Sequence, residues 1–142
     1  MPPTTINQNA LSRLTELSAW VSETNEFKAE QENLFRCSDE GRHVRVDPLL
    51  GELGFNKIKG YGYSIWRIRG KIALKATRHY QSLFFPLSIK SGSGSAAGEV
   101  QAAGEVLTPG SYISFSSPLT LDSQLDCLIV YLPKTDDSSV AE

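Results

Sequence analysis

The chain has 142 residues, with 14 Lys and Arg against 16 Asp and Glu, and 40% of its residues are hydrophobic. That length suits one domain with its own core, and the composition excludes a chain that is disordered throughout. The sequence holds no apolar run near the roughly 18 residues of a membrane span, and its N-terminus is unlike a secretory signal. Cys37 and Cys127 stand far apart, which is typical of reduced thiols. We therefore expect a cytoplasmic protein with no membrane partner.

The charges are unevenly distributed along the chain. Residues 53–98 include no Asp or Glu but hold 8 of the 14 basic residues. This segment could face an anion, or it could meet the acidic flanks when the chain folds. The second interpretation is favoured, because a nearly neutral total is unlike a free-standing nucleic-acid binder.

The N-terminal part predicts one amphipathic helix. After a loose arm over residues 1–9, apolar side chains recur at helical spacing at Ala10, Leu14, Leu17 and Val21. The candidates for its N-cap are Thr5, Asn7 and Asn9. The helix could continue through Phe27 toward Glu32. Its apolar stripe is expected to dock on the domain, with a dimer contact as the alternative.

From Leu34 onward the pattern changes to the period of two that is typical of strands. Within residues 64–75, apolar side chains alternate with cations. The side chains expected inside are Trp66, Ile68, Ile72 and Leu74, and those expected outside are Arg67, Arg69, Lys71 and Lys75. Gly70 in the middle predicts a bulge, a bend or a break.

The next strand, over residues 80–89, repeats this alternation. One face is expected to carry Leu83, Phe85, Leu87 and Ile89, and the other Tyr80, Ser82, Phe84 and Ser88. Pro86 cannot donate to a ladder and predicts an edge position or a bulge. We expect one shared interior formed by Trp66, Ile68, Leu83, Phe85, Ile113 and Phe115.

Turn signals divide the remaining sequence. A flexible segment at 91–95 precedes Ala-Ala-Gly-Glu-Val, which occurs at 96–100 and at 102–106 and predicts two short strands, each entered through a Gly. A tight turn at 108–111 leads to another strand, which ends at 116–118. The last strand, over 127–132, is apolar on both faces, so the N-terminal helix is expected to cover it. These elements predict an antiparallel barrel or sandwich with one leading helix.

Sequence motifs for catalysis or metal binding are missing. His43 and His79 have no neighbours at metal-ligand spacing. Residues 62–66 begin like a nucleophile elbow but lack its second Gly, and residues 92–98 miss the dinucleotide fingerprint by one position. Asp122 and Asp126 are expected in solvated turns. The prediction is therefore no catalytic residue, no metal and no cofactor.

Aromatic side chains gather in the segment that also holds most of the cations. Aromatic walls with a few polar tips suit a small-molecule pocket, although the same residues could simply fill a barrel core. Arg78 beside His79 is the preferred partner for an anionic ligand, because the alternation places Arg67 and Arg69 outside. The candidate ligand-binding residues are Trp66, Arg78, His79, Tyr80, Phe84 and Tyr112.

Several segments follow one another in the order and spacing of a known family. They are residues 49–55, 61–65 and 80–88, the turn 107–110, residues 116–118 and residues 126–133. In this pattern of strands and turns, residues 34–133 resemble the N-terminal, cupin-like sensory domain of AraC-type transcriptional regulators.

The resemblance implies a mainly β fold, a cupin-like antiparallel β-barrel or jelly-roll with an N-terminal amphipathic helix. It also implies a homodimer that binds a small effector and controls DNA binding through C-terminal helix-turn-helix motifs. Such motifs do not follow Pro133, so DNA contact is expected only through a region absent from this chain. The expected layout is an arm and helix over 1–33, a sensory barrel over 34–133 and an acidic linker or tail over 134–142.

Three functional interpretations remain. The leading one is a ligand-sensing and dimerisation domain that is not an enzyme, and the acid-free segment suggests an anionic effector. The alternative is a metal-free, cupin-like isomerase or lyase, in which His79 or Tyr80 would be the titratable group. The third is a dimerisation domain with a filled barrel.

Overall fold

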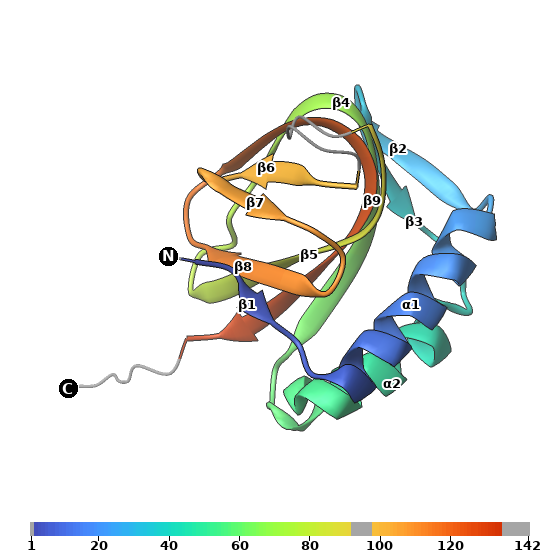
Figure 1. Cartoon of the computed structure of the whole chain (residues 1–142), viewed down its shortest axis with the longest axis vertical. Coiled ribbons are helices and arrows are strands. Elements are labelled where there is room, and N and C mark those ends of the chain that lie inside the picture. Colours follow the sequence, from blue (N-terminus) through green and yellow to red (C-terminus); the bar gives the residue numbers. More distant parts are fainter. Residues whose placement is uncertain (1, 92–97, 135–142) are drawn as a thin grey trace.

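The computed structural model describes residues 2–91 and 98–134. A curved antiparallel sheet has the strand order β1-β8-β5-β9-β4-β3-β2, and the hairpin β6-β7 lies within its concave side (Figure 1). The strands of the two sheets are β1 (Thr4–Thr5), β2 (Phe27–Gln31), β3 (Leu34–Cys37), β4 (Gly62–Leu74), β5 (Tyr80–Ser91), β6 (Val100–Ala102), β7 (Glu105–Leu107), β8 (Ser111–Phe115) and β9 (Leu119–Pro133). The helices are α1 (Gln8–Glu23), α2 (Arg42–Leu53) and the short 3₁₀ helix η1 (Phe55–Lys57). The expected mainly β, barrel-like fold with an N-terminal helix is confirmed.

The centre of the sheet is the pairing of β4 with β9. The two strands stay in register from Gly62 opposite Tyr131 to Leu74 opposite Leu119. Gly70 therefore marks neither a bulge nor a break. A Cβ atom at Gly70 would lie 2.9 Å from Nδ2 of Asn33, so glycine is needed because the β2–β3 turn crosses the strand there.

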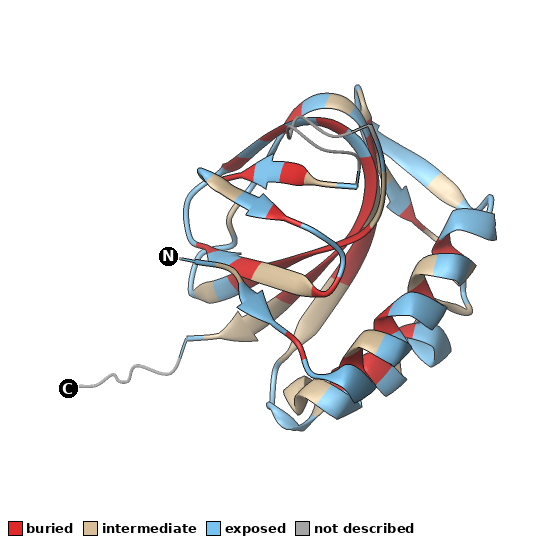
Figure 2. Cartoon of the chain, viewed as in Figure 1, coloured by how far each residue is buried: buried red, intermediate tan, exposed pale blue. Residues whose placement is uncertain are grey.

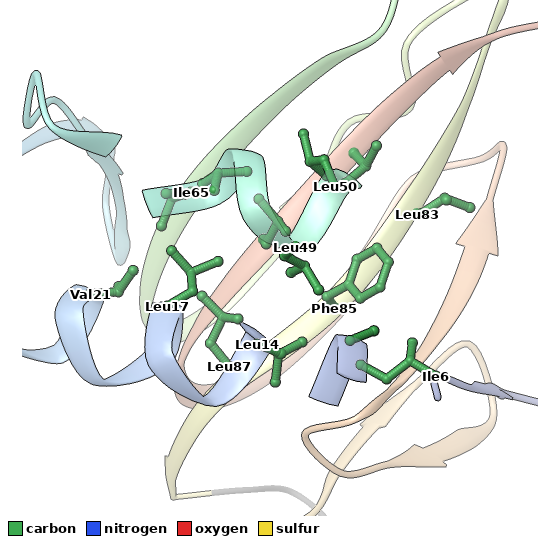
Figure 3. Close-up of a cluster of buried hydrophobic side chains, with 14 of the residues drawn as sticks. Ile6, Leu14, Leu17, Val21, Leu49, Leu50, Ile65, Leu83, Phe85 and Leu87 are labelled. Atoms are coloured by element: carbon green, nitrogen blue, oxygen red, sulfur yellow. The ribbon is translucent and has the colours of Figure 1, made fainter. Parts of the chain in front are cut away.

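Alternation along these strands supplies two separate cores. The outer core lies between the sheet and the two helices, and Figure 3 shows Leu14, Leu17, Leu49 and Phe85 converging within it. The inner core lies between the sheet and the β6-β7 hairpin and includes Ile68, Phe84, Leu107, Ile113 and Phe115. Figure 2 shows that buried residues follow the sheet between its two covers. The central strands are thus covered on both faces where the helices lie, whereas Lys71 of β4 and Asp122 of β9 stay exposed beyond them.

The prediction of one shared interior is therefore wrong for two residues. Leu83 and Phe85 belong to the outer core, whereas Phe84 faces the inner one. The alternation was read correctly, but it does not identify which face is which when both are apolar. The register shifts between Pro86 and Ser88, so the predicted bulge is confirmed, and Ile89 packs on the inner core instead.

Helix α1 begins and packs as its sequence indicates. The side chain of Asn7 accepts a hydrogen bond of 2.8 Å from the backbone N–H of Ala10, which is an N-cap contact. The buried stripe is the predicted one, and α1 covers β9 through the outer core. The helix ends at Glu23, and the next element is strand β2, so the extension toward Glu32 is wrong.

Helix α2 is absent from the sequence prediction, which placed strands throughout residues 34–133. Its buried residues Val46, Leu49 and Leu50 have helical spacing, and Gly54 ends it in the left-handed conformation with a φ of 80°. Pro48 inside the helix weakened that signal, because proline removes a backbone N–H donor. The helix tolerates it as an exposed residue.

Strand β9 is longer than predicted, and Asp126 lies in it rather than in a solvated turn. The carboxylate of Asp126 is only 2% exposed and accepts a hydrogen bond of 2.8 Å from Nε of Arg67 on β4. A guanidinium nitrogen of Arg67 also donates to the carbonyl of Val21 at 2.9 Å, and the guanidinium lies 4.2 Å from the ring centre of Phe27. This buried ion pair joins α1 and β2 to the sheet.

The Ala-Ala-Gly-Glu-Val near-repeat forms the β6-β7 hairpin as far as it is described. Its turn is made by Ala103 and Gly104, whose φ angles of 53° and 79° suit a two-residue hairpin loop. The start of the first copy, the flexible segment and the acidic tail fall at least partly outside the described residues. Within the described part, no helix has the length and apolar character to cross a membrane.

The Arg67–Asp126 pair generates a first prediction. Replacing Arg67→Ala should lower the free energy of unfolding by about 3 kcal/mol, because it leaves a buried carboxylate without its counter-charge. Chemical denaturation measures this loss. Lys71→Ala removes an exposed cation from the same strand and should cost less than about 1 kcal/mol. Equal losses in the two variants would contradict the role given to Arg67.

Asp39 generates a second prediction. The backbone N–H of Gly41 and the hydroxyl of Thr24 donate to its carboxylate at 2.8 and 2.7 Å, and they hold the pKa of Asp39 below its ordinary value of 3.8. A depressed pKa stabilises the fold above the unfolded-state pKa, and this contribution disappears as the pH falls through the folded-state pKa.

The stability lost in Asp39→Ala should therefore be constant near neutral pH and shrink in acid. Thermal unfolding of both proteins across this pH range measures it, with Glu40→Ala as the control for an exposed acid. A difference that grows on acidification would refute the assignment.

Candidate functional site

The six candidate residues of the sequence analysis lie in different parts of the molecule. Phe84 is fully buried in the inner core, and Tyr112 stacks on Phe85 at a centroid distance of 4.6 Å on the outer side of the sheet. Arg78 and His79 are exposed on the turn between β4 and β5, and Tyr80 begins β5 half-buried. Trp66 lies on β4 and lines a cavity. Arg78 and His79 line a hollow that adjoins this cavity, as described below. Phe84 lines neither hollow but shares the inner core with Trp66, and Tyr112 lies on the other side of the sheet.

The cavity around Trp66, which we call the barrel cavity, has a volume of about 320 Å³. It is lined by Glu30, Gln31, Leu34, Trp66, Ala73, Leu74, Lys75, Thr77, Ile129 and Tyr131. Trp66 lies in the first half of β4 and Leu74 at its end, and both reach the same cavity because the strand arches over (Figure 1). The size, and a wall that combines apolar with polar side chains, suit a small-ligand site.

Three polar side chains form a hydrogen-bonded chain at the wall of the barrel cavity. The indole Nε1–H of Trp66 donates to Oγ of Ser64 at 2.7 Å, and that oxygen lies 2.8 Å from the phenol oxygen of Tyr131. Indole can only donate, whereas a hydroxyl can also accept. Ser64 is therefore held by Trp66 while its own proton stays available to Tyr131.

The register of the sheet explains why these groups meet. Ser64 and Trp66 are alternate residues on the inner face of β4, and Tyr131 extends from the same face of β9, opposite Gly62. A Cβ atom at Gly62 would lie 3.9 Å from Cδ2 of Tyr131, so the ring has room beside the glycine. On the other side of Tyr131 in the register lies Ser82, whose buried hydroxyl has no hydrogen-bond partner within the described structure.

A second hollow, which we call the basic rim, adjoins the barrel cavity because both are lined by Lys75 and Thr77. It has a volume of about 470 Å³ and is lined by Lys75, Ala76, Thr77, Arg78, His79, Ser116, Pro118 and Lys134. The backbone N–H of Lys134 donates to the carbonyl of His79 at 3.0 Å, and that of Tyr80 donates to Thr77 at 3.1 Å. These bonds fix the turn, whose residue His79 has a φ of 70°.

Other cations of the acid-free segment are engaged elsewhere. Arg67 is on the outer face, as predicted, but Asp126 neutralises it under α1. The guanidinium of Arg69 lies 5.9 Å from the ring centre of Phe35. Two cations outside that segment, Arg36 and Arg42, line a further hollow. The guanidinium of Arg36 lies 5.5 Å from the ring centre of Trp66, and that of Arg42 donates to the backbone carbonyl of Asp39 at 2.8 Å. The sequence analysis overlooked Arg36.

The sequence analysis also overlooked Ser64, Tyr131, Lys75 and Lys134 as site residues. Alternation already placed Ser64 on the Trp66 face, and extending it along β9 would have put Tyr131 on the face of Ile129 and Cys127. The contact of Lys134 with the turn before β5 has no sequence signal, because it depends on how β9 leaves the sheet beside β5.

The buried thiols and the histidines contribute no further cluster. Burial raises the pKa of the Cys127 thiol and of the Cys37 thiol, so both favour the protonated form. Nδ1 of His43 lies 3.2 Å from the phenol oxygen of Tyr63, away from His79 in the sequence and in the fold. Across residues 2–91 and 98–134, no three His, Cys, Asp or Glu side chains are grouped so that they could hold a metal ion.

Comparisons with known proteins bear on the fold. No family model and no curated protein matches the sequence. The solved structure of ectoine synthase from P. lautus is similar with a TM-score of 0.43 and 13% identity, over 81% of this chain and 74% of that chain. The structure of DMSP lyase DddQ from Ruegeria pomeroyi DSS-3 is similar with a TM-score of 0.34 and 10% identity, over 99% of this chain and 79% of that chain.

These comparisons correct one expectation and leave another as it was. The prediction that the chain is not an enzyme is contradicted, because both neighbours are named as enzymes, a synthase and a lyase. At these TM-scores the similarity does not transfer either activity to this chain. Membership of the AraC-type regulators is not shown and stays a prediction.

The Trp66–Ser64–Tyr131 chain generates a third prediction. Ser64→Ala should lower the free energy of unfolding by about 1–2 kcal/mol, because it removes the acceptor of the Trp66 indole N–H in a mostly buried place. In a Trp20→Phe background, the single remaining indole proton should also move upfield in the NMR spectrum. Ser114→Ala, on an exposed serine, is the control. An unchanged indole resonance would contradict the hydrogen bond.

Proposed function

We propose that this chain binds a small organic molecule in the barrel cavity and acts on it by proton transfer, as an isomerase or a lyase does. The observation that carries the proposal is the phenol of Tyr131, which lines the cavity. Its oxygen lies 2.8 Å from Oγ of Ser64, to which the indole of Trp66 donates at 2.7 Å. The site differs from the one expected for this chemistry, which was His79 or Tyr80.

The hydrogen-bonded chain suits a group that gives up and regains a proton. When the Tyr131 phenol donates its proton to a ligand oxygen or carbon, the resulting phenolate accepts the hydrogen bond of the Ser64 hydroxyl. Trp66 fixes the position of Ser64, so this donor does not have to reorganise during the reaction. The same phenolate can then take a proton from carbon. General acid–base assistance of this kind is worth about 10²–10⁴-fold in rate.

The cavity wall supports binding before any chemistry takes place. Leu34, Leu74 and Ile129 provide apolar contact, and Trp66 provides an aromatic face. Burial of apolar ligand surface against them supplies affinity, and the polar chain orients the ligand.

The regulatory interpretation would use the same cavity. A sensor releases its effector unchanged, whereas a proton-transfer enzyme exchanges or displaces protons of its ligand. The fate of the bound molecule therefore separates the two interpretations.

A fourth prediction tests where the ligand binds. The chain has two tryptophans, Trp20 on α1 and Trp66 in the cavity. In a Trp20→Phe protein, fragments that bind the cavity should change the emission of Trp66. The same fragments should leave the emission of a Trp66→Phe protein unchanged, because Trp20 packs on the outer side of the sheet. Fragments that change only the emission of Trp20 would refute the site.

The second stage of this test concerns chemistry. Fragments that bind are incubated with the protein in deuterium oxide, and the loss of carbon-bound proton signals is followed by NMR. Tyr131→Phe should slow this exchange by at least about 100-fold while the dissociation constant changes by less than about threefold. Tyr61→Phe, a half-buried phenol outside the barrel cavity, is the matched control. Binding with no exchange in the unaltered protein would favour the sensor over the enzyme.

A further inference from the structure

We infer that the ligand of this chain is a small organic anion, whose charged group lies on the basic rim while its uncharged part enters the barrel cavity. The inference rests on the proposed function and deepens it by naming the class of ligand. The observation behind it is that the two hollows adjoin, since Lys75 and Thr77 line both.

The basic rim carries one sign of charge. Its charged or titratable lining side chains are those of Lys75, Arg78, His79 and Lys134, and all four residues are exposed. Two hydrogen bonds hold their backbone in place, from Lys134 to His79 and from Tyr80 to Thr77. An isolated exposed cation binds an anion weakly in water, but three that converge on one hollow add their fields.

The charges near the barrel cavity are of both signs. Glu30 lines the cavity from β2 and opposes an anion, whereas Lys75 lines the same cavity and favours one. Arg36 adds a second cation beside Trp66, at 5.5 Å from the ring centre. The balance around the two hollows is positive, and the acid-free segment at residues 53–98 contributes two of the three rim cations, Lys75 and Arg78.

The neighbouring cavity distinguishes an organic anion from a simple ion. A free phosphate or sulfate would satisfy the rim but leave the apolar wall of Leu34, Leu74 and Ile129 unused. A carboxylate, sulfonate or phosphate ester on an apolar body would use both. Arg presents a planar fork to such oxyanions, and Lys presents a point charge, so the rim suits any of these head groups.

Two dyes with the same carbon skeleton test the inference. Anilinonaphthalene sulfonate carries a negative charge, whereas phenylnaphthylamine is its neutral counterpart, and both fluoresce when they enter an apolar site. The anionic dye should bind at least about fivefold more tightly, and raising the salt concentration should weaken the anionic dye alone. Competition by benzoate, phenyl phosphate and benzamide then ranks the head groups, with the neutral amide last.

Charge variants locate the effect. The double variant Lys75→Gln with Arg78→Gln should weaken the anionic dye by about tenfold and the neutral dye by less than twofold. Lys57→Gln with Lys59→Gln removes two exposed lysines of the same acid-free segment that line neither hollow, and it should change neither affinity. Glu30→Gln should strengthen binding of the anionic dye, because it removes the negative charge at the cavity. An unchanged melting temperature would show that this gain does not come from partial unfolding.

Other results would overturn either the anionic class of the ligand or the proposed function. Equal binding of the two dyes, or equal losses in the two double variants, would overturn the anionic class while leaving the cavity in place. If neither dye binds and the Trp66 emission assay is also silent, the proposed function fails instead. Displacement of the anionic dye by a short oligonucleotide, with the neutral dye still bound, would assign the rim to nucleic acid and overturn the inference.

Discussion

Strands β4 and β9 pair over the whole length of β4, 13 residues, without a shift in register. Because successive side chains leave a strand on opposite faces, each of the two strands has to supply two cores at once. The outer core needs helices to cover it, and the inner core needs the β6-β7 hairpin and the curvature of the sheet. A slip of one residue would exchange these two sets of side chains and bury the cations of β4 in the inner core. The fold therefore depends on this register more than on any single contact.

The ion pair of Arg67 with Asp126 follows from the same register, which places the two residues opposite each other on the outer face. Removing two charges from water is costly, and here the geometry offsets part of that cost. The carboxylate of Asp126 accepts hydrogen bonds from two guanidinium nitrogens of Arg67, at 2.8 and 3.3 Å. The carbonyl of Val21 accepts another hydrogen bond from the same guanidinium. A lysine has no planar fork and would not satisfy these acceptors together. The pair also specifies where the end of α1 lies on the sheet.

The candidate site is a consequence of curvature. A flat β4 would hold Trp66 and Leu74 apart, whereas the arched strand brings both to the wall of one cavity. The β4–β5 turn and the end of β9 then meet at its mouth, where Lys75, Arg78 and Lys134 share a hollow. The polar chain through Ser64 is placed by the alternation of β4, and its partner Tyr131 is placed by the pairing with β9. The proposed binding and chemistry thus use the inner face, while the outer face serves stability.

Elements with a periodic, local pattern could be predicted from the amino-acid sequence. The α1 stripe, the alternation in β4, the bulge near Pro86 and the cover of β9 by α1 were all predictable, because each depends on spacing within one segment. Helix α2 had a comparable signal at Val46, Leu49 and Leu50, but Pro48 interrupts it. Only the tertiary structure decided which face of β5 is inner, that Asp126 is buried against Arg67, and that Lys134 joins Arg78 at the rim. Those outcomes depend on register and curvature between strands distant in the chain, which no local spacing records.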